Sequence, residues 1–166
     1  MMKRVKRYIA ALCCLVLLAG LTACGDDAGA GSDVDLSSIV EEMKKTDTSI
    51  PEMKTVTEAS ENAETTFAVL TDFDYSRIVK FTYSYSATGS PEEIALITVK
   101  EKADVGDLMK ALQTHIDSRL ATFQQYDPEQ ASVVEGAVLT FQDRTVCLAI
   151  APTSGAMQDV FKTKMS

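Results

Sequence analysis

Hydrophobic residues recur along this chain with a period of two in some segments and of 3.6 in others. The two periods predict strands and helices respectively. From residue 78 to residue 86 every second side chain is apolar or aromatic, which is typical of a strand. Its expected core face carries Val79, Phe81, Tyr83 and Tyr85. The other face carries lysine and hydroxyl side chains, and we expect it to contact water. Turn-forming residues over 87–91 lead into a second strand over 92–100, so the two strands predict a hairpin.

A period of 3.6 residues predicts one long helix over residues 103–125. Its apolar side chains form a single continuous stripe, made of Val105, Leu108, Met109, Leu112, Ile116, Leu120 and Phe123. The sequence Tyr126-Asp127-Pro128 ends this helix, because the residue before a proline is displaced from the helical conformation. Asp127 can then cap a further helical turn that has Pro128 at its first position.

Shorter elements are expected on either side of these two features. We expect a helix with Asp35 as its N-cap, a second with Ser60 as its cap, and a C-terminal helix over 153–164. An edge strand is expected over 53–58 and a second hairpin over 138–151. The order predicts an α+β fold, in which an antiparallel sheet from two β-hairpins has a long central helix and flanking helices packed on it.

The N-terminal segment has the layout of a secretory signal. Four basic residues precede roughly a dozen apolar ones, and a small residue then precedes Cys24. The run Leu21-Thr22-Ala23-Cys24 is similar to the lipobox of bacterial lipoproteins, whose signal peptidase cuts before the cysteine once its thiol carries diacylglycerol. We therefore expect Cys24 to become the mature N-terminus and to carry lipid, with palmitate among the acyl chains.

This layout predicts three segments: a lipoprotein signal peptide over 1–23, a flexible acidic tether over 24–33, and a single domain over 34–166. An uncleaved transmembrane helix would need about 20 apolar residues, more than the roughly 16 that precede Cys24. A signal with an ordinary Ala-x-Ala cut is the other alternative. The expected location is the cell membrane, with the chain lipid-anchored on the extracytoplasmic face.

The chain is acidic, with 24 acidic residues, 16 basic residues and a formal net charge of −8. Removal of residues 1–23 would take away four basic residues and no acidic ones, which gives a mature net charge of about −12. A nucleic-acid-binding domain needs a basic surface, so we do not expect nucleic acid as a partner. The simplest interpretation of the acidity is solubility.

Few residues are candidates for catalysis or metal binding. Only Cys147 would remain as a free thiol in the mature domain, and its apolar surroundings indicate core packing. His115 is the only histidine, and no nucleophile elbow surrounds a serine, so we expect a structural histidine. The acidic pairs that begin at Asp33 and Asp72 lack EF-hand spacing. We therefore expect no catalytic residue, no metal and no cofactor.

Glu93, Arg119 and Tyr126 form the most suggestive polar group. Glu93 begins the second strand, Arg119 lies almost along the apolar stripe of the long helix, and Tyr126 ends that helix. An arginine on such a stripe needs an acceptor, because an unpaired buried charge is unfavourable. Arg119 could hold an anionic ligand in a notch walled by Tyr126. The simpler interpretation is a salt bridge from Arg119 to Glu93 or to the acidic end of the helix.

These segments resemble the DUF4358 lipoproteins of Firmicutes over residues 35–163. The resemblance rests on the lipobox, the acidic tether, the strand over 93–100, the helix that carries Arg119, and the corner Tyr126-Asp127-Pro128-Glu129-Gln130. Thr98 stands where a lysine is common in the family's strand. The family has no known function, so the resemblance implies an extracytoplasmic lipoprotein and supplies no catalytic residues.

The anchor and the absence of an assembled catalytic set together favour a non-enzymatic binding or accessory module of the cell envelope. Its partner would be an envelope protein or a small ligand. A cell-wall-acting hydrolase or transferase that uses Glu93, His115 and Tyr126 is the first alternative, and it requires these side chains to meet in one open pocket. A purely structural envelope protein is the second alternative, and it requires a fully paired Arg119 and no pocket.

Overall fold

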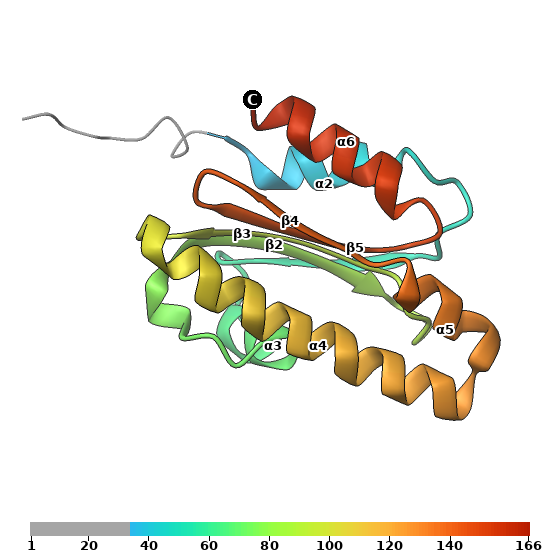
Figure 1. The fold of residues 1–166 in the computed structure, drawn as a ribbon. Coiled ribbons are helices and arrows are strands. Elements are labelled where there is room, and N and C mark those ends of the chain that lie inside the picture. The colour runs from blue at the N-terminus through green and yellow to red at the C-terminus, as the bar shows by residue number, and fades with distance from the viewer. Residues whose placement is uncertain (1–33) are drawn as a thin grey trace, which may run out of the picture. The chain divides into compact units, whose positions relative to one another are not determined.

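The computed structural model describes residues 34–166, which form a five-stranded antiparallel sheet with helices on both faces (Figure 1). The α+β class expected from the sequence is confirmed. The expected signal peptide over 1–23, Cys24 and the tether over 24–33 lie outside the described residues. Within 34–166, no helix is both long enough and apolar enough to cross a membrane.

The described chain contains both helices and strands, in a mixed order. The α-helices are α2 (Leu36–Lys44), α3 (Ala63–Leu70), α4 (Val105–Tyr126), α5 (Pro128–Glu135) and α6 (Ser154–Lys164). The strands are β1 (Met53–Thr57), β2 (Ile78–Ser86), β3 (Glu93–Val99), β4 (Val138–Gln142) and β5 (Thr145–Ile150). Two short 3-10 turns, η1 (Tyr75–Arg77) and η2 (Lys102–Asp104), precede β2 and α4.

The strands lie in the order β1-β2-β3-β5-β4, and each pair of neighbours is antiparallel. The two expected hairpins are β2–β3 and β4–β5, and they meet where β3 pairs with β5. The expected edge strand is β1, and β4 forms the opposite edge. Glu93 therefore lies inside the sheet, between Tyr85 of β2 and Ile150 of β5.

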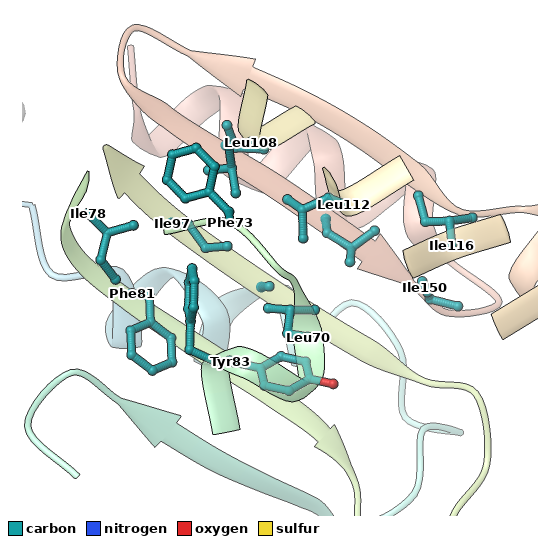
Figure 2. Close-up of a cluster of buried hydrophobic side chains, with 14 of the residues drawn as sticks. Leu70, Phe73, Ile78, Phe81, Tyr83, Ile97, Leu108, Leu112, Ile116 and Ile150 are labelled. Atoms are coloured by element: carbon teal, nitrogen blue, oxygen red, sulfur yellow. The ribbon is translucent and has the colours of Figure 1, made fainter. Parts of the chain in front are cut away.

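Two hydrophobic cores fill the spaces above and below the sheet. The first lies under α3, α4 and α5 and includes Phe67, Leu70, Phe81, Tyr83, Ile97, Leu108 and Leu112 (Figure 2). The second lies under α2 and α6 and includes Leu36, Val40, Met43, Ile94, Leu96, Cys147 and Phe161. Because β3 sends alternate side chains into both cores, its whole length is buried. The long helix thus covers one face of the sheet and lies in the outer layer of the fold.

The hydroxyl-bearing face of β2 is buried, and the expectation that it contacts water is wrong. Thr82 and Ser84 lie beneath α2, the helix that covers this face. Their hydroxyl groups find protein partners, Thr82 with Ser37 at 3.2 Å and Ser84 with Thr55 at 2.6 Å. These hydrogen bonds compensate the loss of water on burial.

Two further local expectations are corrected by backbone geometry. Val79 is 47% exposed, because the β2–β3 register shifts between Ile78 and Lys80, and such a bulge turns a side chain away from its expected face. The helix α3 has Asn62 at its N-cap position. Ser60 lies in the turn before it, where its Oγ accepts a hydrogen bond from the N–H of Thr57 at 3.1 Å.

Asp47 joins the loop after α2 to the start of α6. Its carboxylate accepts hydrogen bonds from the Ser49 hydroxyl at 2.5 Å, the Ser49 N–H at 2.8 Å and the Thr153 hydroxyl at 3.0 Å. The bond from the Ser49 hydroxyl contributes most to holding the pKa of Asp47 below its ordinary value of 3.8, although burial acts in the opposite direction.

We expect Asp47→Asn to lower the free energy of unfolding by about 1–2 kcal/mol at pH 7. A carboxylate with a depressed pKa stabilises the fold above its unfolded-state value of 3.8, and this contribution is lost as the pH falls through the lower folded-state value. Urea unfolding of both proteins at pH 7 and below pH 4 measures the difference. The exposed control Asp159→Asn should change stability by less than about 0.5 kcal/mol. If Asp47→Asn lowers the free energy of unfolding as much below pH 4 as at pH 7, the Asp47 carboxylate does not stabilise the fold through its charge.

Candidate functional site

Glu93 is the centre of a polar cluster between the sheet and α4. It is the first residue of β3, and its side chain is only 5% exposed. Alternation along the strand places it on the same face as Ala95 and Ile97, the face that α4 covers. A carboxylate in such a position needs partners, because an unpaired buried charge is strongly unfavourable.

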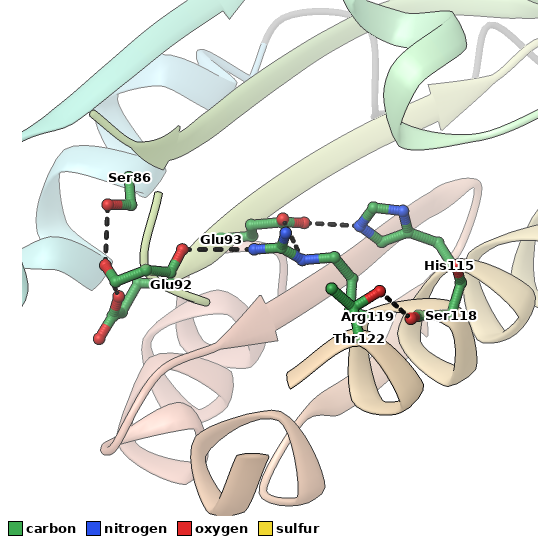
Figure 3. A network of polar contacts seen from close by, with 8 residues as sticks. Ser86, Glu92, Glu93, His115, Ser118, Arg119 and Thr122 are labelled. Atoms are coloured by element: carbon green, nitrogen blue, oxygen red, sulfur yellow. Dashed lines mark hydrogen bonds and ion pairs between the residues drawn. The ribbon is translucent and has the colours of Figure 1, made fainter. Parts of the chain in front are cut away.

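Two basic side chains of α4 share the Glu93 carboxylate (Figure 3). The Nε2 atom of His115 lies 2.6 Å from Glu93 Oε2, and the Nε atom of Arg119 lies 2.9 Å from Glu93 Oε1. Arg119 lies four positions after His115, so both project from the same side of the helix, about one turn apart. The result is a three-residue bridge that joins the middle of α4 to the start of β3.

Arg119 also contacts the β2–β3 loop and its own helix. One terminal nitrogen, Nη2, donates a hydrogen bond to the carbonyl oxygen of Ser90 at 3.3 Å, and the guanidinium lies over the ring of Phe123, 4.9 Å from its centroid. The Nε contact with Glu93 is an ion pair by distance, without the alignment of a hydrogen bond. Arg119 is therefore held on three sides by the domain itself.

Tyr83 joins the cluster from β2. Burial is the main cause that raises the pKa of its phenol above the usual value, and the nearby Glu93 carboxylate acts in the same direction. The positive charge of Arg119 opposes them. Tyr83 therefore stays protonated at neutral pH.

Tyr126 lies apart from this cluster. It is the last residue of α4 and is 78% exposed, and seven residues of helix place it roughly 10 Å along the axis from Arg119. Of the three residues singled out in the sequence, the structure brings Glu93 and Arg119 together and leaves Tyr126 in solvent. Tyr126 therefore does not take part in the Glu93 cluster.

The corner that begins at Tyr126 shapes the backbone. Asp127 is the N-cap of α5, and its Oδ1 accepts a hydrogen bond from the N–H of Gln130 at 3.3 Å. The side-chain amide of Gln130 donates to Asp127 Oδ2 at 2.9 Å, and Pro128 occupies the first turn of α5. This arrangement ends α4 and starts α5 in a fixed direction.

Sequence reasoning left Tyr83 out of the cluster and grouped His115 with Glu93 only in the enzymatic alternative. The available signal for His115 is its spacing of four residues from Arg119, which places both on one helix face. Tyr83 carries no such signal. Its contact with Glu93 depends on the register of β2 against β3, which pairs Tyr85 with Glu93.

Two hollows of the surface lie outside this cluster. An apolar cavity of about 170 Å³ lies between α3 and β2 and is lined by Thr65, Thr66, Val69, Tyr83 and Tyr85. An open groove of about 400 Å³ lies beside the start of α4 and carries Asp72, Asp74, Arg77, Asp107 and Lys110. Neither of these two hollows has Glu93, His115 or Arg119 in its lining.

The two hollows differ in chemistry. The apolar cavity can hold one group the size of a single ring, which is less than the 300 Å³ or more of an ordinary small-molecule site. In the open groove, Arg77 is bound to Asp104 at 2.6 Å and to Asp107 at 3.0 Å, and it lies over the Phe73 ring. These carboxylates also raise the pKa of Arg77 above its usual value, so the guanidinium stays protonated. Its positive charge is balanced by the two carboxylates that bind it.

The remaining candidates for chemistry are inert in this setting. Cys147 is fully buried in the second core, as its sequence context predicts, and burial raises the pKa of its thiol to about 12. A thiolate is therefore scarce at neutral pH. Across residues 34–166, no three His, Cys, Asp or Glu side chains are grouped so that they could hold a metal ion.

Comparison with known proteins identifies one family. Residues 54–151 match the model of DUF4358, a domain of unknown function. The matched region begins at the second residue of β1 and ends just after β5, so it contains the sheet except Met53, together with α3, α4, α5 and the Glu93 cluster. No curated protein and no solved structure matches the chain.

Proposed function

This chain belongs to the DUF4358 family of domains of unknown function, and we propose from its own residues that it is a lipid-anchored, non-enzymatic binding module on the extracytoplasmic face of the cell membrane. The observation that carries the non-enzymatic part is the sharing of one buried carboxylate, that of Glu93, by His115 and Arg119. The groups most suited to acid–base chemistry are thus bound to one another.

A general acid or base must reach its substrate directly or through one water molecule. The side chains of His115 and Arg119 are only 12% and 27% exposed, and both point to Glu93. Their arrangement supports a scaffold role, because it joins α4 to the β2–β3 hairpin, whose Tyr83 lines the apolar cavity. A hydrolase that also used Tyr126 would need all of them in one pocket, and the exposed position of Tyr126 speaks against it.

The purely structural alternative is less well supported. It requires a domain without a cavity, whereas the described surface has an apolar cavity between α3 and β2 and an open groove beside α4. The small size of the apolar cavity favours an anchoring side chain of a protein partner over a larger free ligand.

The membrane-anchored part rests on the sequence. The lipobox Leu21-Thr22-Ala23-Cys24 follows a basic and an apolar segment, and the described domain begins at Val34. Two or three acyl chains on Cys24 would bind stably, where one would be marginal.

We expect Cys24→Ser to abolish lipid attachment. Cells that express the full chain would be fed an alkyne analogue of palmitate, and the label and the molecular mass would be measured on the purified protein. The wild type should be labelled and lack residues 1–23, whereas Cys24→Ser should be unlabelled and keep them, because the cut follows lipid attachment. The matched control Cys147→Ser should behave as the wild type, because Cys147 is buried in the folded domain. Equal labelling of Cys24→Ser and the wild type would overturn the anchor.

The non-enzymatic part has its own test. Purified full chain is incubated with cell-wall fragments, and released products are measured by mass spectrometry. No turnover is expected. Turnover that Glu93→Gln and His115→Ala both abolish, with the fold retained by circular dichroism, would show an enzyme and refute the proposal.

A further inference from the structure

We infer that the outer edge of β4 binds an extended segment of a partner protein, which would add one strand to the sheet. The inference deepens the proposed binding function, on which it rests, by naming the surface and the class of partner. Strand addition to an open sheet edge is a recurrent mode of peptide recognition, in which backbone hydrogen bonds supply affinity and alternate side chains supply specificity.

The backbone of β4 is open on one side. In the described part of the chain β5 is its only neighbour in the sheet, and their register runs from Val138 to Gln142 without a shift. A two-residue connection makes Gln142 and Thr145 the closing pair of this hairpin. Because alternate residues of an antiparallel strand bond to opposite sides, Leu139 and Phe141 direct their N–H and C=O groups outward, away from β5.

The two edges of the sheet differ in how they are protected. The β1 edge has an exposed lysine, Lys54, and exposed glutamates on both sides of the strand. One of these, Glu58, follows the last residue of β1 and accepts a hydrogen bond from the N–H of Phe81 in β2 at 3.1 Å. That backbone donor is therefore already paired within the domain. By contrast, residues 138–142 contain no charge, no proline and no bulge. Charges, prolines and bulges are the features that keep edge strands from pairing.

The side chains of β4 extend the first core to this open edge. Leu139 and Phe141 lie opposite Leu148 and Val146, on the face that α4 and α5 cover. Leu139 is half-buried against that core, and Phe141 is 50% exposed. An added strand with apolar residues at alternate positions would pack against both and cover Phe141.

Charge favours a different protein over a second copy of this chain. Two mature chains would each carry a net charge of about −12, and this charge would oppose their association. The occupant assigned here is therefore an extended segment of a partner protein, with apolar residues at alternate positions and lysine or arginine between them.

The probe is a synthetic peptide of alternating lysine and valine, seven residues long. It is added to the full chain in mild detergent, and amide exchange is followed by NMR. We expect saturating peptide to slow exchange of the outward amides of Leu139 and Phe141 by at least about tenfold. The same peptide with N-methyl groups on alternate residues should have no effect, since it cannot complete the backbone ladder.

Two matched variants locate the site. Phe141→Lys adds the charge that edge strands use for protection, and it should weaken peptide binding by at least about tenfold. Val79→Lys changes a similarly exposed apolar residue of β2 and should bind as the wild type does. Because both positions are exposed, neither change should unfold the domain.

Three results would overturn the inference: unchanged exchange at Leu139 and Phe141, equal binding by Phe141→Lys and the wild type, or protection confined to β1. A dimer of the full chain that Phe141→Lys dissociates would identify a second copy as the occupant and would refute the assignment to a partner protein. Lipid labelling of Cys24 and turnover of cell-wall fragments are separate measurements, so failure of the proposed function is distinguishable from failure at β4.

Discussion

We expect Glu93→Ala to lower the free energy of unfolding by about 2–4 kcal/mol, because it removes the shared carboxylate of a largely buried ion-pair cluster. Arg119 and His115 would lose their common partner. The range lies below that of a fully buried pair, because the partly exposed Arg119 can regain some contact with water.

Urea unfolding at pH 7 measures this effect, and a double variant provides its control. Glu93→Met combined with Arg119→Met removes both charges while keeping similar volumes, so it should destabilise less than Glu93→Ala alone. That ordering distinguishes an unpaired charge from simple loss of packing. The structure indicates that Arg119 needs Glu93 as its partner. A double variant less stable than Glu93→Ala would contradict this dependence.

Phe81→Ala has a comparable or larger expected effect, a loss of about 3–5 kcal/mol, because it opens a cavity in the first core. Phe81 is fully buried on β2 (Figure 2). Its ring packs edge-to-face on Phe67 at 5.3 Å and on Tyr75 at 6.1 Å between centroids. Phe67 and Tyr75 also contact each other at 5.3 Å. Removing one ring therefore ends two aromatic contacts of this group of three.

The control for Phe81→Ala is the same change at an exposed site. Phe141→Ala on β4 removes an equal number of atoms where half of the side chain already contacts water, so its effect should be below about 1 kcal/mol. Thermal unfolding followed by circular dichroism, with urea unfolding on the same samples, gives both values. Similar losses for the two variants would be inconsistent with the core position of Phe81.

Elements with one buried and one polar side could be predicted from the chain alone. The apolar stripe of α4, from Val105 to Phe123, faces the sheet as its period indicates, and Asp127 and Pro128 separate α4 from α5. The place of the hairpin β2–β3 also follows from its alternation and its turn residues, although both faces of its strands are buried. In each case the information on the element is local, because one short window of residues sets it.

The covering of the second face could not be predicted in this way. Alternation in β2 separates apolar from hydroxyl side chains, but it does not tell whether a helix will cover the hydroxyl side. Thr82 and Ser84 are buried because α2 packs there and because Ser37 and Thr55 provide hydroxyl partners. Small hydroxyl side chains tolerate burial once hydrogen-bonded, so their polarity alone predicts little about exposure.

The candidate site was predictable only in part, for a related reason. Arg119 on an apolar stripe signalled a need for an acceptor, and Glu93 within an apolar strand was a reasonable partner. The participation of His115 and Tyr83 depends on how α4 lies across β3 and on the register of β2. Tyr126 was included because it ends the same helix, but its side chain is exposed.

The junction between the hairpins has a consequence for the order of folding. Each hairpin closes a short loop and can form within roughly 1–10 μs. The pairing of β3 with β5 brings together Thr98 and Thr145, 47 residues apart, with α4 and α5 in the intervening chain. The entropy lost in closing that longer loop places the main barrier at this step. Substitutions along the β3–β5 junction should therefore slow folding more than they speed unfolding. The centre of the finished sheet thus assembles after its two hairpins.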